Sequence, residues 1–130
     1  MSEKVLSGLK DGIQMPVAWN WDHRFTAALA IVSDEHAQGV ITRLRNTMTE
    51  VDHATSLEID GSDLSSLSQH LGNLRGEQQL YVKVMDDGEI AYCTAWPWLS
   101  GDNISFRFGV FNINSQEAIE QPSRSKFCPQ

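Results

Sequence analysis

The feature that most constrains the fold is a set of three alternating segments in the C-terminal half of the chain. Apolar side chains recur at every second position over residues 80–85, 89–96 and 104–110, which is the period of a β-strand. Between the first two segments stands Asp87-Gly88, a dipeptide typical of a two-residue hairpin turn because both positions tolerate a positive φ. The pattern therefore predicts an antiparallel three-stranded meander with a primed turn at Asp87-Gly88.

The first half of the chain alternates between strand and helix patterns. Strands are expected at residues 17–22, 25–32 and 55–59. Helices are expected at residues 37–48 and 63–75, with a weaker helical pattern at 5–13. The resulting order ββαβαβββ predicts an α+β fold with two layers. We expect a mixed, mostly antiparallel sheet of about six strands with two main helices on one face.

The chain has 130 residues, a length that suits one domain. We expect this single α+β domain to span residues 1–114. Residues 115–130 are polar and rich in Ser, Gln and Pro, which is typical of a C-terminal tail. We expect this tail to pack on its own chain or on a neighbouring one.

The charge balance and the cysteine count limit the partners and the compartment. The net charge of −7 argues against binding to nucleic acid or to an anionic membrane, since both need clustered Lys and Arg. An acidic mimic of nucleic acid is a weaker alternative, because the carboxylates are spread along the chain. Two cysteines are too few for a disulfide framework, and the chain opens without a secretory pattern. We therefore expect a cytoplasmic protein that binds neither nucleic acid nor membrane.

Short catalytic and metal-binding motifs are missing from the sequence. It contains no glycine-rich phosphate loop, no G-x-S-x-G nucleophile turn and no Cys-x-x-Cys or His-Glu-x-x-His pattern. The histidines stand apart from one another, at His23, His36, His53 and His70, and we expect them to be exposed. The sequence therefore predicts no catalytic residue, no metal and no cofactor.

The tryptophans form two similar pairs, Trp19-x-Trp21 and Trp96-Pro-Trp98. Rings two positions apart on a strand point to the same side, and such rings suit a planar ligand or a partner surface. The same rings could instead cover one end of the core. The candidate ligand-binding residues are Trp19, Trp21, His23, Trp96, Trp98 and Arg107.

The two faces of the predicted sheet differ in side-chain size. The face expected to meet the helices carries bulky residues: Phe25, Leu29, Ile31, Leu80, Val82, Ile90, Tyr92, Phe106 and Phe108. The opposite face carries small or flexible ones: Ala28, Ala30, Val32, Met85, Ala91, Cys93, Ala95 and Gly109. Residues 1–22 and 112–130 could cover this second face, and so could a second subunit. We expect the latter, as a dimer.

Together these features favour a small cytoplasmic accessory or binding protein that acts as a homo-oligomer. Its partner is expected to be a small apolar or aromatic molecule, or another protein. The alternative is an enzyme with a pocket near the paired tryptophans, in which Asp22, His23 or Arg107 supplies polar groups.

Overall fold

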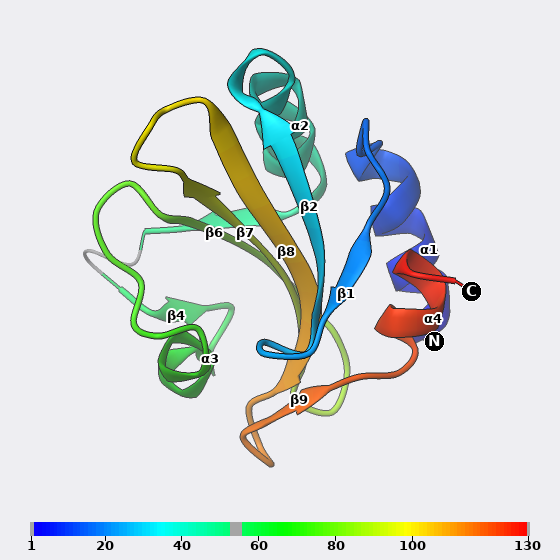
Figure 1. The fold of residues 1–130 in the computed structure, drawn as a ribbon. Helices are drawn as coiled ribbons and strands as arrows, with labels where there is room; N and C mark the ends of the chain where they lie inside the picture. Colours follow the sequence, from blue (N-terminus) through cyan, green and yellow to red (C-terminus); the bar gives the residue numbers. More distant parts are fainter. Residues whose placement is uncertain (1, 53–55, 130) are drawn as a thin grey trace.

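The fold was analysed in a computed structural model that describes residues 2–52 and 56–129. The elements in chain order are α1 (Ser2–Ile13), β1 (Asn20–Asp22), β2 (Ala27–Ser33), α2 (Asp34–Thr47), β3 (Thr49–Val51), β4 (Glu58–Ile59), β5 (Ser62–Asp63), α3 (Ser65–His70), β6 (Gln79–Val84), β7 (Glu89–Pro97), β8 (Asn103–Asn112), β9 (Glu117–Ile119) and α4 (Ser123–Phe127). One sheet of seven strands has the order β1-β2-β8-β7-β6-β3, with β9 also paired to β8, while β4 and β5 pair separately. The predicted α+β fold with a mostly antiparallel sheet is confirmed (Figure 1).

The three-stranded meander and its first turn are also confirmed. Strands β6, β7 and β8 pair antiparallel in sequence order. At the turn, φ is 58° for Asp87 and 79° for Gly88, and the Glu89 amide donates to the Asp86 carbonyl over 3.1 Å. Two positive φ angles in succession are the signature of a primed turn, whose twist matches that of the flanking strands.

Helices α1, α2 and α4 cover one face of the sheet, and α3 with the β4–β5 hairpin covers part of the other (Figure 1). The two longest helices, α1 and α2, therefore share one face, whereas the two helices expected to do so, at residues 37–48 and 63–75, lie on opposite faces. On α2 the predicted apolar stripe is buried: Ala37, Val40, Ile41 and Leu44.

The helix expected over residues 63–75 differs from the prediction in length and position. Only Ser65–His70 is helical, and its flanking leucines pack on the face opposite α2. The helix stops early because Gly72 and Asn73 have φ of 85° and 63°. The Asn73 amide then donates back to the Ser68 carbonyl over 2.8 Å, which closes the helix end well before Gly76.

The prediction of which β8 side chains share a face was wrong. Phe106 and Phe108 lie among the small residues, on the face covered by α1, α2 and α4. Their cross-strand neighbours are small: Ala30 and Ala95 beside Phe106, and Ala28 and Cys93 beside Phe108. The alanines thus make room for two aromatic rings rather than forming a flat surface. Gly109 instead lies on the other face, opposite Tyr92.

The small-residue face is covered by the chain itself, so the reason for expecting a dimer does not hold. Leu6, Leu9 and Ile13 of α1 are buried there, and so is Phe127 of α4. The C-terminal tail was expected to pack on its own chain or on a neighbouring one. In the structure it contacts its own chain, because β9 pairs with β8 and α4 packs beside α1 (Figure 1). The oligomeric state itself stays a prediction.

An arginine on α2 fixes the end of α1. Arg43 donates from Nε to the Ile13 carbonyl over 2.7 Å and from Nη2 to the Gln14 carbonyl over 3.0 Å. The last carbonyls of a helix have no intrahelical partner and carry partial negative charge, so a guanidinium stabilises them. This contact determines where the chain leaves α1 for β1. Among the residues that the structure describes, no helix is long and apolar enough to cross a membrane.

Candidate functional site

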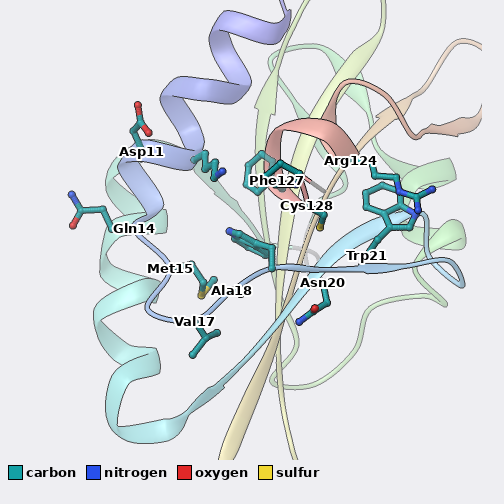
Figure 2. Close-up of a pocket in the computed structure, with 13 residues that line it drawn as sticks. Asp11, Gln14, Met15, Val17, Ala18, Asn20, Trp21, Arg124, Phe127 and Cys128 are labelled. Atoms are coloured by element: carbon teal, nitrogen blue, oxygen red, sulfur yellow. The ribbon is translucent and has the colours of Figure 1, made fainter.

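A pocket of about 600 Å³ lies where the two ends of the chain meet (Figure 2). Its walls are the last turn of α1, the segment from Gln14 to Ala18, strand β1, and α4 with the two residues after it. Pockets that hold small molecules span about 300–1,000 Å³. The size of this pocket therefore suits a small-molecule ligand.

The base of the pocket is an aromatic cluster. Trp19 is 9% exposed and meets the rings of Phe108 and Phe127 edge-on, at centroid distances of 6.4 and 5.2 Å. Phe108 and Phe127 are stacked at 4.1 Å with an interplanar angle of 16°. Edge-to-face and offset-stacked arrangements are the favourable ones for aromatic rings. The cluster fixes α4 against β8 and gives the pocket a rigid apolar base.

Trp21 and Arg124 form one side of the pocket. The Arg124 guanidinium carbon lies 5.5 Å from the centroid of the Trp21 ring, within the range of a cation–π contact. Arg124 Nη1 also donates to Glu120 Oε2, four residues earlier in the chain, over 2.6 Å. Figure 2 shows the Arg124 and Trp21 side chains lying together, on the side of the pocket away from Asp11 and Gln14.

Lys10 and Cys128 supply further polar groups to the walls. Lys10 Nζ donates to the Lys126 carbonyl over 2.7 Å, which links α1 to α4. Burial raises the pKa of the half-buried Cys128 thiol, while the charges of Arg124 and Lys10 oppose that shift. The raised pKa keeps this thiol protonated at neutral pH, and a protonated thiol is a poor nucleophile.

A second polar and aromatic cluster lies on the opposite face of the sheet. Arg107 Nε donates to Asp22 Oδ2 over 3.0 Å, and both side chains are less than one-fifth exposed. The guanidinium carbon of Arg107 lies 4.8 Å from the Phe25 ring centroid and 4.7 Å from that of Trp96. A mostly buried guanidinium that contacts two rings and pairs with a carboxylate connects β1, β7 and β8, which gives this cluster a structural role in the sheet.

The six predicted ligand-binding residues do not form one site. Trp19 and Trp21 belong to the pocket, whereas Trp96 and Arg107 lie together on the other face. Trp98 is 43% exposed beyond the end of β7, where its Nε1 donates to Ser105 Oγ over 2.9 Å. His23 is exposed in the β1–β2 turn.

Only Trp19 and Trp21 of the pocket were predicted from the sequence, and the residues that were missed include four on which its structure depends: Lys10, Arg124, Phe127 and Cys128. Three of them lie in the segment that its composition assigned to a polar tail. Phe127 was the one available signal, because a lone bulky aromatic residue in a polar segment needs a place to be buried.

The histidines form no recognisable metal site in the described part of the chain. His23 and His36 are exposed, and the half-buried His70 places Nε2 2.9 Å from the Phe25 carbonyl oxygen. His53 lies outside the described residues. Within residues 2–52 and 56–129, no group of three or more His, Cys, Asp and Glu side chains is placed to hold a metal ion.

Comparison with protein-family models, with curated proteins and with solved structures found no significant match.

Proposed function

We propose that this chain is a binding protein that takes a small, flat, apolar molecule into the pocket between α1, β1 and α4. The observation that carries the proposal is the aromatic base of a pocket of about 600 Å³, formed by Trp19 and Phe127 with Trp21 at its side. Aromatic side chains offer a large contact area at a small loss of conformational entropy. A planar ligand would gain most from such a surface.

The walls of the pocket are held in place before any ligand arrives. Arg43 fixes the end of α1, Lys10 links α1 to α4, and Phe127 is buried beneath α4. A preformed site avoids the cost of ordering loops on binding, so more of the contact energy contributes to affinity.

The enzymatic alternative has less support from the pocket. Its cations are engaged in structural contacts, with Lys10 on a backbone carbonyl and Arg124 on Glu120. The thiol of Cys128 is held protonated by its raised pKa. An enzyme site would be supported by a nucleophile and a base in contact, and the contacts described here for Lys10, Arg124 and Cys128 include no such pair.

The proposal is tested with the neutral dye N-phenyl-1-naphthylamine, which fluoresces when it enters an apolar site. We expect saturable binding to the native chain that falls by about tenfold or more in Trp21→Ala, a loss of at least about 1.4 kcal/mol. Ala18→Trp is a second variant, because Ala18 is exposed at the rim and a large side chain there blocks entry without disturbing the core.

Trp98→Ala is the control variant, because Trp98 is exposed and lies outside the pocket. Circular dichroism on each variant checks that it is folded. Dye binding that survives both Trp21→Ala and Ala18→Trp, or that is abolished by Trp98→Ala alone, would show that the pocket is not the site.

A second candidate function is association with another copy of this chain, through a patch that we define as Ile31, Trp98 and Leu99. These side chains are 44%, 43% and 107% exposed. Ile31 and Trp98 both flank Ser105, one as its cross-strand partner and one through a hydrogen bond. Exposed apolar patches of this kind are typical of interaction sites. Sedimentation velocity is the test: a dimer that dissociates in Leu99→Ser supports it, and a 14.6 kDa monomer at all concentrations refutes it.

A cytoplasmic location also stays a prediction. Both cysteines are free, Cys93 in the core and Cys128 at the pocket, which suits a reducing compartment. Fractionation of the source cells, followed by immunodetection, checks it.

A further inference from the structure

We infer that the ligand of this pocket carries an anionic group beside its flat apolar part, and that Arg124 and Lys10 bind the anionic group. The inference rests on the proposed function and names the chemical class of the ligand. A carboxylate, a sulfonate or a phosphate ester on an aromatic or polycyclic body meets this description.

The local charge of the pocket has the opposite sign to that of the chain. The whole chain carries a net charge of −7, yet the charged residues that line the pocket are Lys10, Arg124 and Asp11. Figure 2 shows Asp11 on α1 with its carboxylate turned away from Phe127 and Cys128. The charged groups that face the interior of the pocket are therefore positive. This is unusual in a chain where carboxylates outnumber cations 17 to 10.

Each cation uses one of its donors in a side-chain hydrogen bond and retains further donors. Arg124 uses Nη1 for Glu120, and a guanidinium has five N–H donors in total. Lys10 uses one of the three N–H donors of its ammonium group for the Lys126 carbonyl. An anionic ligand can therefore be bound without breaking the contacts that orient the two side chains.

The carboxylate of Glu120 does not remove the attraction of Arg124 for an anion. The two side chains are 37% and 46% exposed, so their ion pair is screened by water and contributes little free energy. A ligand anion that is itself partly enclosed between Arg124 and Lys10 experiences less screening. The Trp21 ring, 5.5 Å from the guanidinium carbon, keeps the charge close to the surface on which a flat ligand would lie.

The test compares two dyes that share one aromatic body. 1-Anilinonaphthalene-8-sulfonate carries a sulfonate, and N-phenyl-1-naphthylamine lacks it. We expect the native chain to bind the sulfonate dye about tenfold more tightly than the neutral one at low ionic strength, a difference of about 1.4 kcal/mol. Added salt should reduce this preference, because it screens the two cations.

Variants identify the groups responsible. Arg124→Gln and Lys10→Gln should each reduce the preference for the sulfonate dye severalfold, because each should weaken binding of the sulfonate dye much more than binding of the neutral dye. Arg45→Gln is the matched control, because Arg45 also forms an exposed ion pair with a glutamate, Glu50, but lies outside the pocket. It should change neither affinity.

The outcomes separate this inference from the proposed function. Equal affinities for the two dyes, both abolished by Ala18→Trp, would overturn the anionic ligand and leave the apolar pocket in place. A preference that Arg45→Gln reduces as much as Arg124→Gln would also overturn it, since general surface charge would then explain the effect. Binding of neither dye, or binding that Ala18→Trp does not affect, would refute the proposed function itself.

Discussion

Replacing Phe127 by alanine should detach α4 and remove one wall of the pocket. The Phe127 side chain is 2% exposed, stacked on Phe108 at 4.1 Å and edge-on to Trp19 at 5.2 Å. Truncation of a buried phenylalanine costs about 3–5 kcal/mol, because apolar surface is lost and a cavity remains. The contacts with the two rings are part of that figure.

The small size of α4 sets an upper limit on the measured loss. Since α4 has only five residues, the variant can release α4 instead of keeping a cavity. The free energy of unfolding then falls only by the free energy with which α4 packs on the rest of the chain. We therefore expect a loss of about 2–4 kcal/mol, which extends below the range of about 3–5 kcal/mol for such truncations. Phe127→Leu keeps most of the apolar volume and should lose about 1.5 kcal/mol or less.

Urea unfolding followed by tryptophan fluorescence measures the loss, and limited trypsin digestion reports the release of α4. In Phe127→Ala, cleavage after Arg124 and Lys126 should be much faster than in the native chain. A loss below about 1 kcal/mol together with unchanged cleavage would refute the docking of α4 through Phe127.

Three further predictions follow from contacts of the core and the pocket. Gly109→Ala should destabilise the fold by about 1–3 kcal/mol in urea unfolding, since its Cβ would lie 2.6 Å from the hydroxyl oxygen of Tyr92; a neutral effect would contradict the register of β7 and β8. Burial raises the pKa of both tyrosines, that of Tyr81 to about 12. Absorbance at 295 nm should therefore show no tyrosine ionisation near pH 10 in the folded chain, and the free energy of unfolding should fall only as the pH rises above about 10. Tyrosine ionisation at pH 10 in the folded chain would contradict this burial. A thiol reagent should modify only Cys128 in the folded chain, because Cys93 is buried, and bound dye should slow that reaction; equal rates with and without dye would contradict the position of the pocket.

Local patterns predicted the parts of the fold in which a few neighbouring residues decide the outcome. The turn at Asp87-Gly88 determines the register of β6 and β7, because turn chemistry and the alternation on both sides agree. The stripe from Ala37 to Leu44 likewise predicts which side of α2 is buried.

The choice of face along β8 could not be obtained from alternation alone. Alternation puts Phe106 and Phe108 on one side of this strand and Arg107 and Gly109 on the other, but it does not show which side meets the helices. What decides it is size complementarity with neighbouring strands: Phe106 and Phe108 lie beside alanines and Cys93, and Gly109 lies beside Tyr92. Those pairings depend on the register between β2, β8 and β7, and this register cannot be deduced from a single sequence.

The sequence predicted only part of the candidate site, for a similar reason. Alternation placed Trp19 and Trp21 on the same side of one strand, and both line the pocket. It could not show that Trp96 belongs to the opposite face, since the face of a strand depends on its pairing. Arg124 and Lys10 come from opposite ends of the chain, and only the packing of α4 beside α1 brings them to one pocket.

The most direct test of the proposed site uses the indole N–H signals of the four tryptophans in a ¹H–¹⁵N correlation spectrum. Each signal is assigned through a single Trp→Phe variant, and N-phenyl-1-naphthylamine is then titrated into the native chain. If the ligand enters the pocket between α1, β1 and α4, the signals of Trp19 and Trp21 shift with a common saturation curve and those of Trp96 and Trp98 stay in place. Shifts confined to Trp96 or Trp98 would contradict the account.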